Sequence, residues 1–157
     1  GSLSAYSNRA TLRSYGVDPR LAQSTQEQFV AAVPDRHKQF LRELDWIVEV
    51  TQQFRDEGAE EARTRRLYCI HAGVLPNRGL GAQLSALKRR DFFDAVLIED
   101  MDRDPGRVAA LCTRLEVQGP HPELAGTSDV VVSGHHGFVQ VGRNRVIMDS
   151  SGGRPGV

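Results

Sequence analysis

The chain has 157 residues, and its 20 Lys and Arg side chains balance its 20 Asp and Glu side chains, so the formal net charge is zero. This length predicts one domain, and the balanced charge argues against a whole-molecule footprint for nucleic acid or for an anionic membrane surface. Two distant cysteines predict no disulfide framework, and no apolar run approaches the about 20 residues that span a bilayer, so we expect a cytoplasmic protein.

The N-terminal part predicts a loop followed by short helices. The first two dozen residues show no sustained period and are typical of a loop with turns. Ser24 and Glu27 resemble a capping box, and the apolar residues after them predict one or two helical turns. Residues 34–44 predict an amphipathic helix. The buried stripe expected for this helix consists of Phe40, Leu41 and Leu44.

A first buried strand is predicted in the middle of the chain. Residues 46–50 are β-prone, and the mixed charges of residues 55–63 favour a solvated loop over a binding site. Residues 67–70 form a short apolar run that stops at His71, which predicts a buried strand with a histidine at its carboxyl end.

Two helices are predicted next. Leu80, Leu84 and Leu87 share one face of the first helix. The basic residues 88–90 lie at its C-terminal end, where interaction with the helix dipole explains their charge at least as well as phosphate binding does. Residues 106–117 follow the spacing of a core-facing helix, in which Cys112 is expected to be buried.

The last segment predicts a second buried strand and a hairpin. Residues 130–133 are uniformly apolar up to Ser133 and end at the sequence GHHG of residues 134–137. Residues 138–141 and 145–148 flank Gly142, Arg143 and Asn144, which suit a tight turn. Helices that alternate with buried strands predict an α/β layered fold.

The pattern His-x-Gly occurs after both predicted buried strands, at His71 and at His135. Ligand sites in layered α/β folds gather at the carboxyl ends of strands, and neighbouring strands lie about 4.8 Å apart, so both imidazoles could face one metal ion. Glycine after each histidine allows a sharp backbone turn. A single histidine at a strand end is more often a hydrogen-bonded residue at the rim of the sheet than a metal ligand. Because the same context occurs twice, metal binding and this structural role are about equally probable.

The other polar residues near these strands have more ordinary interpretations. His136 is expected to point away from such a site, and His37 and His121 are expected to be solvated bystanders. Asp149 is expected to cap a turn, with orientation of an imidazole as the alternative. Neither Ser133 nor Ser150 lies in the Gly-x-Ser-x-Gly turn between a strand and a helix that is typical of a nucleophilic serine. The sequence also has no glycine-rich loop of the kinds that bind nucleotide phosphates.

Several sequence blocks together resemble the calcineurin-like phosphoprotein phosphatases. The block LYCIHAGV at 67–74, followed by GAQL at 81–84, is similar to the "VHAG…EQL" block of that family. The block VVVSGHHG at 130–137, followed by RVIMDSSGG at 145–153, is similar to its late strand and hairpin. Together with RSYGV at 13–17 and VPDRHKQFL at 33–41, these blocks are closest to the Rhizobiales-like phosphatases of bacteria and plants.

This resemblance implies a sandwich of two mixed sheets flanked by helices, with a two-metal centre at the strand ends. His71 and His135 match two metal ligands of the family, and the ions implied are two divalent metals such as Mn, Fe or Zn. The implied activity is hydrolysis of a phosphorylated protein of phosphotyrosine type, or of a small phosphomonoester, by metal-activated water.

The family motifs Gly-Asp-x-His-Gly, Gly-Asp-x-x-Asp-Arg-Gly and Gly-Asn-His do not occur in this sequence. Residues 1–157 are therefore interpreted as the C-terminal part of a phosphoesterase domain that lacks the N-terminal metal-binding motifs, so no catalytic residue is assigned. Two histidines without carboxylates cannot hold a dinuclear centre, and the isolated chain is expected to be inactive.

Two other hypotheses stay open. One is a non-catalytic binding or regulatory module built on half of a phosphatase fold, with an exposed apolar sheet face that favours self-association or pairing with a missing N-terminal half. The other is a mononuclear zinc or iron hydrolase that uses His71, His135 and one carboxylate such as Asp149.

Overall fold

The computed structural model describes residues 8–18, 25–55, 58, 60–98 and 107–150. The length of the chain predicts one domain, whereas its residues cluster into two compact units, 1–44 and 45–157. In the part of the chain that is described, no helix combines the length and apolar character that crossing a membrane requires.

The first unit contains three helices, α1 (Asn8–Ser14), α2 (Thr25–Ala32) and α3 (Asp35–Glu43). The loop predicted for the N-terminus is therefore wrong over α1. Gly16 lies just beyond the end of this helix with a φ of +75°, which suits glycine, and Val17 N donates to the Leu12 carbonyl at 2.9 Å. These features form a Schellman cap, so Gly16 is the sequence signal that indicates the end of a helix.

Tyr15 links the three helices of the first unit. Its hydroxyl lies 2.8 Å from His37 Nδ1, and its ring meets Phe29 edge-on with centroids 5.5 Å apart. The predicted helix at 34–44 is confirmed as α3, but its expected buried stripe is wrong, because Phe40 and Leu41 are each 62% exposed. A unit of this size has too little chain to cover both sides of a helix.

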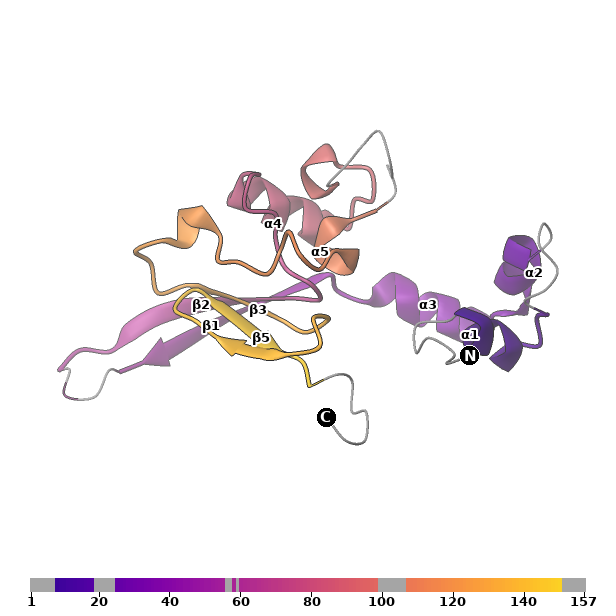
Figure 1. Ribbon diagram of the computed structural model, residues 1–157, viewed down its shortest axis with the longest axis horizontal. Coiled ribbons are helices and arrows are strands. Elements are labelled where there is room, and N and C mark those ends of the chain that lie inside the picture. The colour runs from indigo at the N-terminus through magenta and orange to yellow at the C-terminus, as the bar shows by residue number, and fades with distance from the viewer. Residues whose placement is uncertain (1–7, 19–24, 56–57, 59, 99–106, 151–157) are drawn as a thin grey trace. The chain divides into compact units, whose positions relative to one another are not determined.

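The second unit contains a five-stranded mixed sheet with the order β1-β2-β3-β5-β4 (Figure 1). Strand β2 pairs parallel with β3, and β3 pairs parallel with β5, whereas β1–β2 and β4–β5 are antiparallel. The strands are β1 (Ile47–Phe54), β2 (Arg63–Ile70), β3 (Val130–Ser133), β4 (Val139–Val141) and β5 (Arg145–Met148). Both predicted buried strands, the C-terminal hairpin and the α/β class are confirmed.

The hairpin of β1 and β2 is longer than the sequence indicates. Strand β1 continues to Phe54 and β2 already begins at Arg63, so part of the predicted charged loop is strand. The β1–β2 ladder pairs Gln53 with Thr64 and Phe54 with Arg63. Polar side chains fit here because most residues at this end of the hairpin are exposed.

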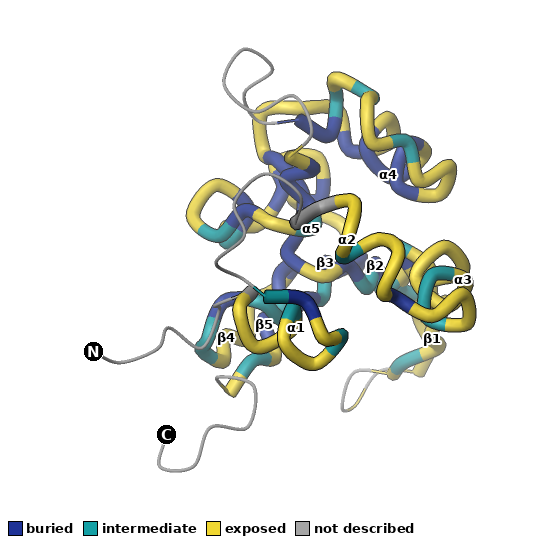
Figure 2. Tube along the Cα trace, turned by 90° about the vertical axis from the view of Figure 1, so that its right-hand side faces the viewer, coloured by how far each residue is buried: buried dark blue, intermediate teal, exposed yellow. Residues whose placement is uncertain are grey.

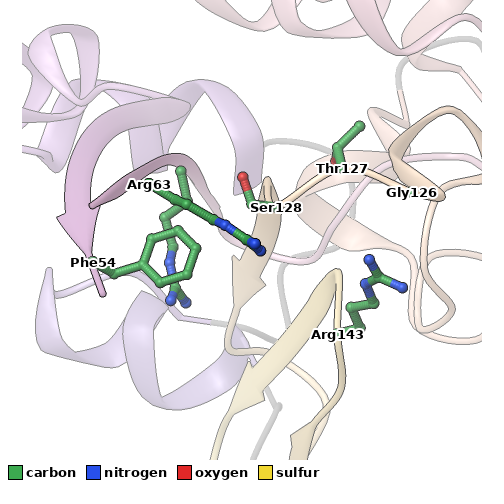
Figure 3. A pocket seen from close by; sticks show the side chains of 7 residues that line it. Phe54, Arg63, Gly126, Thr127, Ser128 and Arg143 are labelled. Atoms are coloured by element: carbon green, nitrogen blue, oxygen red, sulfur yellow. The ribbon is translucent and has the colours of Figure 1, made fainter. Parts of the chain in front are cut away.

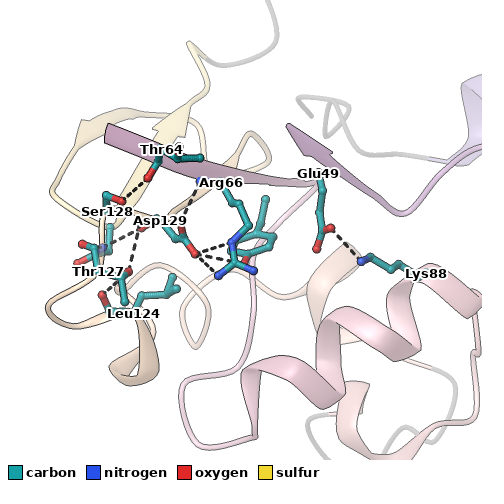
Figure 4. Close-up of polar contacts among 10 residues, drawn as sticks. Glu49, Thr64, Arg66, Lys88, Leu124, Thr127, Ser128 and Asp129 are labelled. Carbon is teal, nitrogen blue, oxygen red and sulfur yellow. Dashed lines mark hydrogen bonds and ion pairs between the residues drawn. The ribbon is translucent and has the colours of Figure 1, made fainter. Parts of the chain in front are cut away.

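Helix α4 (Leu80–Arg89) and its neighbours cover one face of the sheet (Figures 1 and 2). Leu80, Leu84 and Leu87 are buried, which confirms the predicted apolar face. They share one hydrophobic core with Ile47, Tyr68, Ile70 and Val131 of the sheet. Lys88 forms an ion pair of 2.9 Å with Glu49 of β1, as Figure 4 shows.

The opposite face of the sheet is much less covered. Val48 and Val50 of β1 are 48% and 42% exposed, and Met148 of β5 is 64% exposed. The ladder places Val48 beside Cys69 and Val50 beside Leu67, on the face opposite Tyr68 and Ile70. The second unit is thus one sheet with helices on one side, as far as its described residues show.

The predicted helix at 106–117 is largely wrong. Only α5 (Ala109–Cys112) is helical among its described residues, and Gly106 lies outside them. Val108 forms a bridge with Ile98 in extended conformation, so the helix begins after it, and Thr113 is extended again. Cys112, expected to be buried, is exposed as a result.

Asp129 fastens the start of β3 to β2 (Figure 4). Its carboxylate accepts from the Arg66 backbone N–H at 2.9 Å and forms an ion pair of 2.7 Å with the Arg66 guanidinium. Tyr68 donates its hydroxyl to the same carboxylate at 3.4 Å. Burial raises the pKa of Asp129, but the hydrogen bonds and charge of Arg66 outweigh this and hold the pKa below its usual value.

Candidate functional site

The two predicted histidines meet at the carboxyl edge of the sheet. His71 directly follows β2, and His135 lies two residues beyond β3, the parallel neighbour of β2. His71 Nε2 is 3.0 Å from His135 Nδ1, and the ring centroids are 4.7 Å apart. The expected convergence of the two side chains is therefore confirmed, although 64 residues separate them in the chain.

The loop after β3 holds His135 in an unusual backbone conformation. Its φ of +66° lies in the left-handed region, which side chains other than glycine rarely adopt. On either side of it, Gly134 N donates to the His71 carbonyl at 3.1 Å, and Gly137 N donates to Asp149 Oδ2 at 2.6 Å. The turn-capping interpretation of Asp149 is confirmed by this bond. Strain of this kind is often kept where a side chain must be aimed.

Hydrogen bonds assign the proton positions of the histidine pair. His135 Nε2 lies 3.2 Å from the Cys112 carbonyl oxygen, which can only accept, so Nε2 carries the proton. In neutral His135 the Nδ1 atom then has the lone pair, and His71 Nε2 donates to it. A ligand bound by both nitrogens requires His71 to carry its proton on Nδ1 instead.

Both imidazoles favour the neutral form. Burial lowers the pKa of His71, and the neighbouring His135 lowers it further. Burial also lowers the pKa of His135, against the opposing hydrogen bond to the Cys112 carbonyl. The charge of Asp149 raises both pKa values without cancelling the effect of burial. Neutral imidazole is the form that binds metal ions.

Arg145 lies beneath this edge and connects the two loops. It is 2% exposed, and its Nη2 donates to the Ala72 carbonyl at 2.8 Å and to Ser133 Oγ at 2.7 Å. Further bonds run to the carbonyls of Val117, Val131 and Val146. Burial lowers the pKa of Arg145 to about 10, so it stays charged at neutral pH. Ser133 is thus an acceptor for Arg145, which agrees with discounting it as a nucleophile.

Gly73 permits the close packing around Arg145. Its φ is +148°, and a Cβ atom there would lie 2.6 Å from the Val117 carbonyl oxygen and 3.1 Å from Arg145 Nη2. The sequence alone predicted neither the close packing that requires Gly73 nor the burial of Arg145. The His-x-Gly pattern held the signal for Gly73, whereas an arginine in a hairpin strand gives no sign of burial.

A cleft of about 320 Å³ opens beside His71. Cys69, Val132 and Met148 contribute to its largely apolar lining. A cleft of this size lies at the lower end of the range of roughly 300–1,000 Å³ typical of ligand sites. It could receive an apolar group of a molecule whose polar end reaches the histidine pair.

The remaining histidines have structural roles. His136 is buried, and its Nε2 lies 2.8 Å from the Ala72 carbonyl oxygen, so it has a structural hydrogen-bonding role. The prediction of a solvated His121 is wrong, because it is 3% exposed, bonds the Arg78 carbonyl at 2.8 Å and caps a short helix, η2 (Pro122–Leu124). His37 is half-buried against Tyr15 rather than solvated.

The histidine pair fits one side of a metal site. Two nitrogens bound to one ion with bonds of about 2.1 Å lie about 3.4 Å apart at the tetrahedral angle of zinc and about 3.0 Å apart at a right angle. The separation of 3.0 Å between His71 Nε2 and His135 Nδ1 is therefore close to that of two ligands of one ion. Imidazole suits zinc, iron, manganese and copper ions. Among the described residues, however, no group of three or more His, Cys, Asp or Glu side chains could hold a metal. A dinuclear centre, or a site with Asp149 as third ligand, does not fit this part of the chain.

The chain matches no protein-family model, and a search of curated proteins found no significant similarity.

Proposed function

We propose that this chain is part of a metal-dependent phosphoesterase in which His71 and His135 supply two metal ligands. The observation that carries the proposal is the 3.0 Å approach of the two imidazoles at the carboxyl ends of adjacent parallel strands. The neutral state of both rings and the strained φ of His135 support it. The resemblance of the two histidine blocks to the calcineurin-like phosphatases gives the reaction class.

The chain's own residues position the ligands in this proposal. Arg145 holds the carbonyl next to His71 and the hydroxyl of Ser133, so both histidine loops share one buried anchor. Asp149 fixes the turn after His135 and places negative charge near both rings. A bound divalent metal would polarise a phosphoryl oxygen and activate water. The proposed substrate is a phosphorylated protein, of phosphotyrosine type, or a small phosphomonoester.

A non-catalytic binding module is the second candidate. It is favoured because, within the described ranges, no more than two possible metal ligands come together. In that case the chain would bind a metal or partner without supporting hydrolysis.

A metal titration tests the ligand assignment. Co²⁺ is added to the full chain while visible absorption is recorded, and the His71→Ala and His135→Ala variants are compared with His37→Ala as a matched control. We expect each site variant to weaken binding at least tenfold and the control to bind like the unchanged chain. Equal binding by all four proteins, or no binding at all, would contradict the assignment.

Hydrolysis of p-nitrophenyl phosphate with Mn²⁺ tests the reaction class. It is measured for this chain and for a version extended by the residues that the gene encodes upstream. We expect activity in the extended version that is lost on replacing His71 or His135 by alanine. Metal binding without hydrolysis in the extended version would favour the binding module, and activity that survives both substitutions would refute the proposal.

A further inference from the structure

The sheet of the second unit has one face that its described residues leave largely uncovered, and we call it the open face. Residues that pair in neighbouring strands point to the same side of a sheet. Val48 pairs with Cys69, Cys69 with Val132, and Met148 with Val139, so these side chains share the open face. Its centre is therefore apolar from β1 to β4.

Much of this apolar surface is accessible to solvent. Val139 and Val141 of β4 are 64% and 80% exposed, beside the exposed Met148. Glu49, the charged residue of β1, lies on the other face, where it pairs with Lys88. A single exposed valine is ordinary, but an exposed apolar surface that extends over a whole sheet is typical of an interaction site.

The carboxyl end of the open face carries negative charge. The cleft beside His71 lies at this end, because Cys69, Val132 and Met148 contribute to its lining. Asp45 is exposed and also lines the cleft, and no Lys or Arg is among its described lining residues. Asp45 precedes β1, whose partner β2 ends at the same edge.

The amino end of the open face carries positive charge. A cavity of about 440 Å³ lies there, and Phe54, Arg65 and Arg143 contribute to its lining (Figure 3). Glu60 and Glu61, in the loop between β1 and β2, do not line it, and no carboxylate is among the lining residues that the structure describes.

Arg65 is held on the open face by its contacts. It lies four residues before Cys69 on β2, so both side chains point to the same side. Its guanidinium stacks on the Phe54 ring, 3.8 Å from the centroid, and its Nε is buried without a hydrogen-bond partner among the described residues. This stacking fixes a positive charge at one end of an apolar surface whose other end holds Asp45.

We infer that a second copy of this chain covers the open face, with its strands antiparallel to those of the first copy. A two-fold axis that lies across the strands stacks the two open faces and keeps β1 of one copy over β1 of the other. Asp45 of each copy then faces the end of β2 that holds Arg65 of the other copy. Parallel stacking would place like charges over each other instead, which costs free energy.

This arrangement satisfies the general requirements of a symmetric dimer. The same surface of both copies takes part, so the contact closes on itself and forms a dimer rather than a filament. Sheets pack face to face about 10 Å apart in β-sandwiches, with side chains of both inner faces forming the core. The inference does not rest on the proposed function, because it involves no metal and no phosphate.

Sedimentation velocity of the full chain over a range of concentrations, in EDTA, tests the dimer. We expect a reversible equilibrium between one chain and two, and we expect Val50→Lys and Met148→Lys each to weaken association at least tenfold. The control is Phe93→Lys, which changes an 80% exposed apolar residue away from the sheet and should leave association unchanged. The thermal unfolding temperature checks that each variant is folded.

Three results of this experiment would overturn the inference. The first is a single chain at every concentration, and the second is growth to species larger than two chains. The third is association that only Val50→Lys weakens, because it would assign the contact to the free edge of β1 rather than to the open face, on which Met148 also lies.

A charge exchange tests the antiparallel orientation. We expect Asp45→Arg and Arg65→Asp each to weaken association at least fivefold, because each places like charges together. The double variant Asp45→Arg/Arg65→Asp restores opposite charges across the contact and should associate within about twofold of the unchanged chain. If the double variant associates no better than either single variant, the proposed stacking of the two copies is wrong.

Discussion

Arg145 Nη2 donates a hydrogen bond of 2.8 Å to the carbonyl oxygen of Ala72, the residue that follows His71. The same nitrogen bonds Ser133 Oγ, two residues before His135. One buried cation therefore sets the position of both histidine loops. On the solvent side of these loops, His71 is exposed and His135 is half-buried.

Replacing Arg145 tests this anchoring role through stability. We expect Arg145→Met to lower the free energy of unfolding by about 3 kcal/mol or more, because each buried acceptor left unpaired costs about 1–3 kcal/mol. The matched control is Arg143→Met in the nearby exposed turn, for which we expect a change within about 0.5 kcal/mol. Urea unfolding measures both, and equal stabilities of the two variants would disprove the anchoring role.

Two glycines give a paired test of backbone packing. We expect Gly73→Ala to destabilise the protein by about 2–4 kcal/mol, because the new Cβ would meet the Val117 carbonyl at 2.6 Å and φ is positive. Gly81 lies inside α4 with open space around it, so Gly81→Ala should instead stabilise the protein by about 0.5–1 kcal/mol. Thermal unfolding should therefore shift in opposite directions, and a shift of the same sign would show that the packing is misjudged.

Asp129 provides a test of the polar contacts between β2 and β3. We expect Asp129→Asn to cost about 1–3 kcal/mol, because a largely buried carboxylate loses its ion pair with Arg66. Asp35 pairs with Lys38 on the surface of α3, and Asp35→Asn should cost less than about 0.5 kcal/mol. Chemical denaturation compares the two, and a similar small loss in both would rule out the role given to Asp129.

The pH dependence of stability follows from the same carboxylate. The pKa of Asp129 is lower in the folded protein than the usual value of 3.8, so the unfolded chain binds the proton first as pH falls. The stabilisation is complete well above pH 3.8 and is lost as pH falls through the folded pKa. The stability difference between wild type and Asp129→Asn should thus be constant near pH 6 and shrink below about pH 4. A difference that stays constant down to pH 3 would refute this linkage.

The strands and the histidine pair could be predicted because local patterns determined them. Uniformly apolar runs before His71 and Ser133 indicated buried strands, and parallel pairing then brought the two strand ends together. The helix at 106–117 could not be predicted correctly, because the bridge between Val108 and Ile98 depends on tertiary structure. Burial of His121 and Arg145 was missed for the same reason, since their partners are carbonyls distant in sequence.

The parallel pairing of β2 and β3 also determines the order in which parts of the chain fold. The β1–β2 hairpin closes over residues 55–62, whereas the histidine pair joins positions 64 residues apart. Closing the longer segment costs about 2 kcal/mol more in chain entropy, so the hairpin should form first and the histidine edge late. Pulsed hydrogen exchange should protect amides of β1 before those of β3, and the reverse order would contradict this. The histidine edge then exists only in molecules in which β3 has joined the sheet, so binding at the proposed site would measure the fully folded fraction.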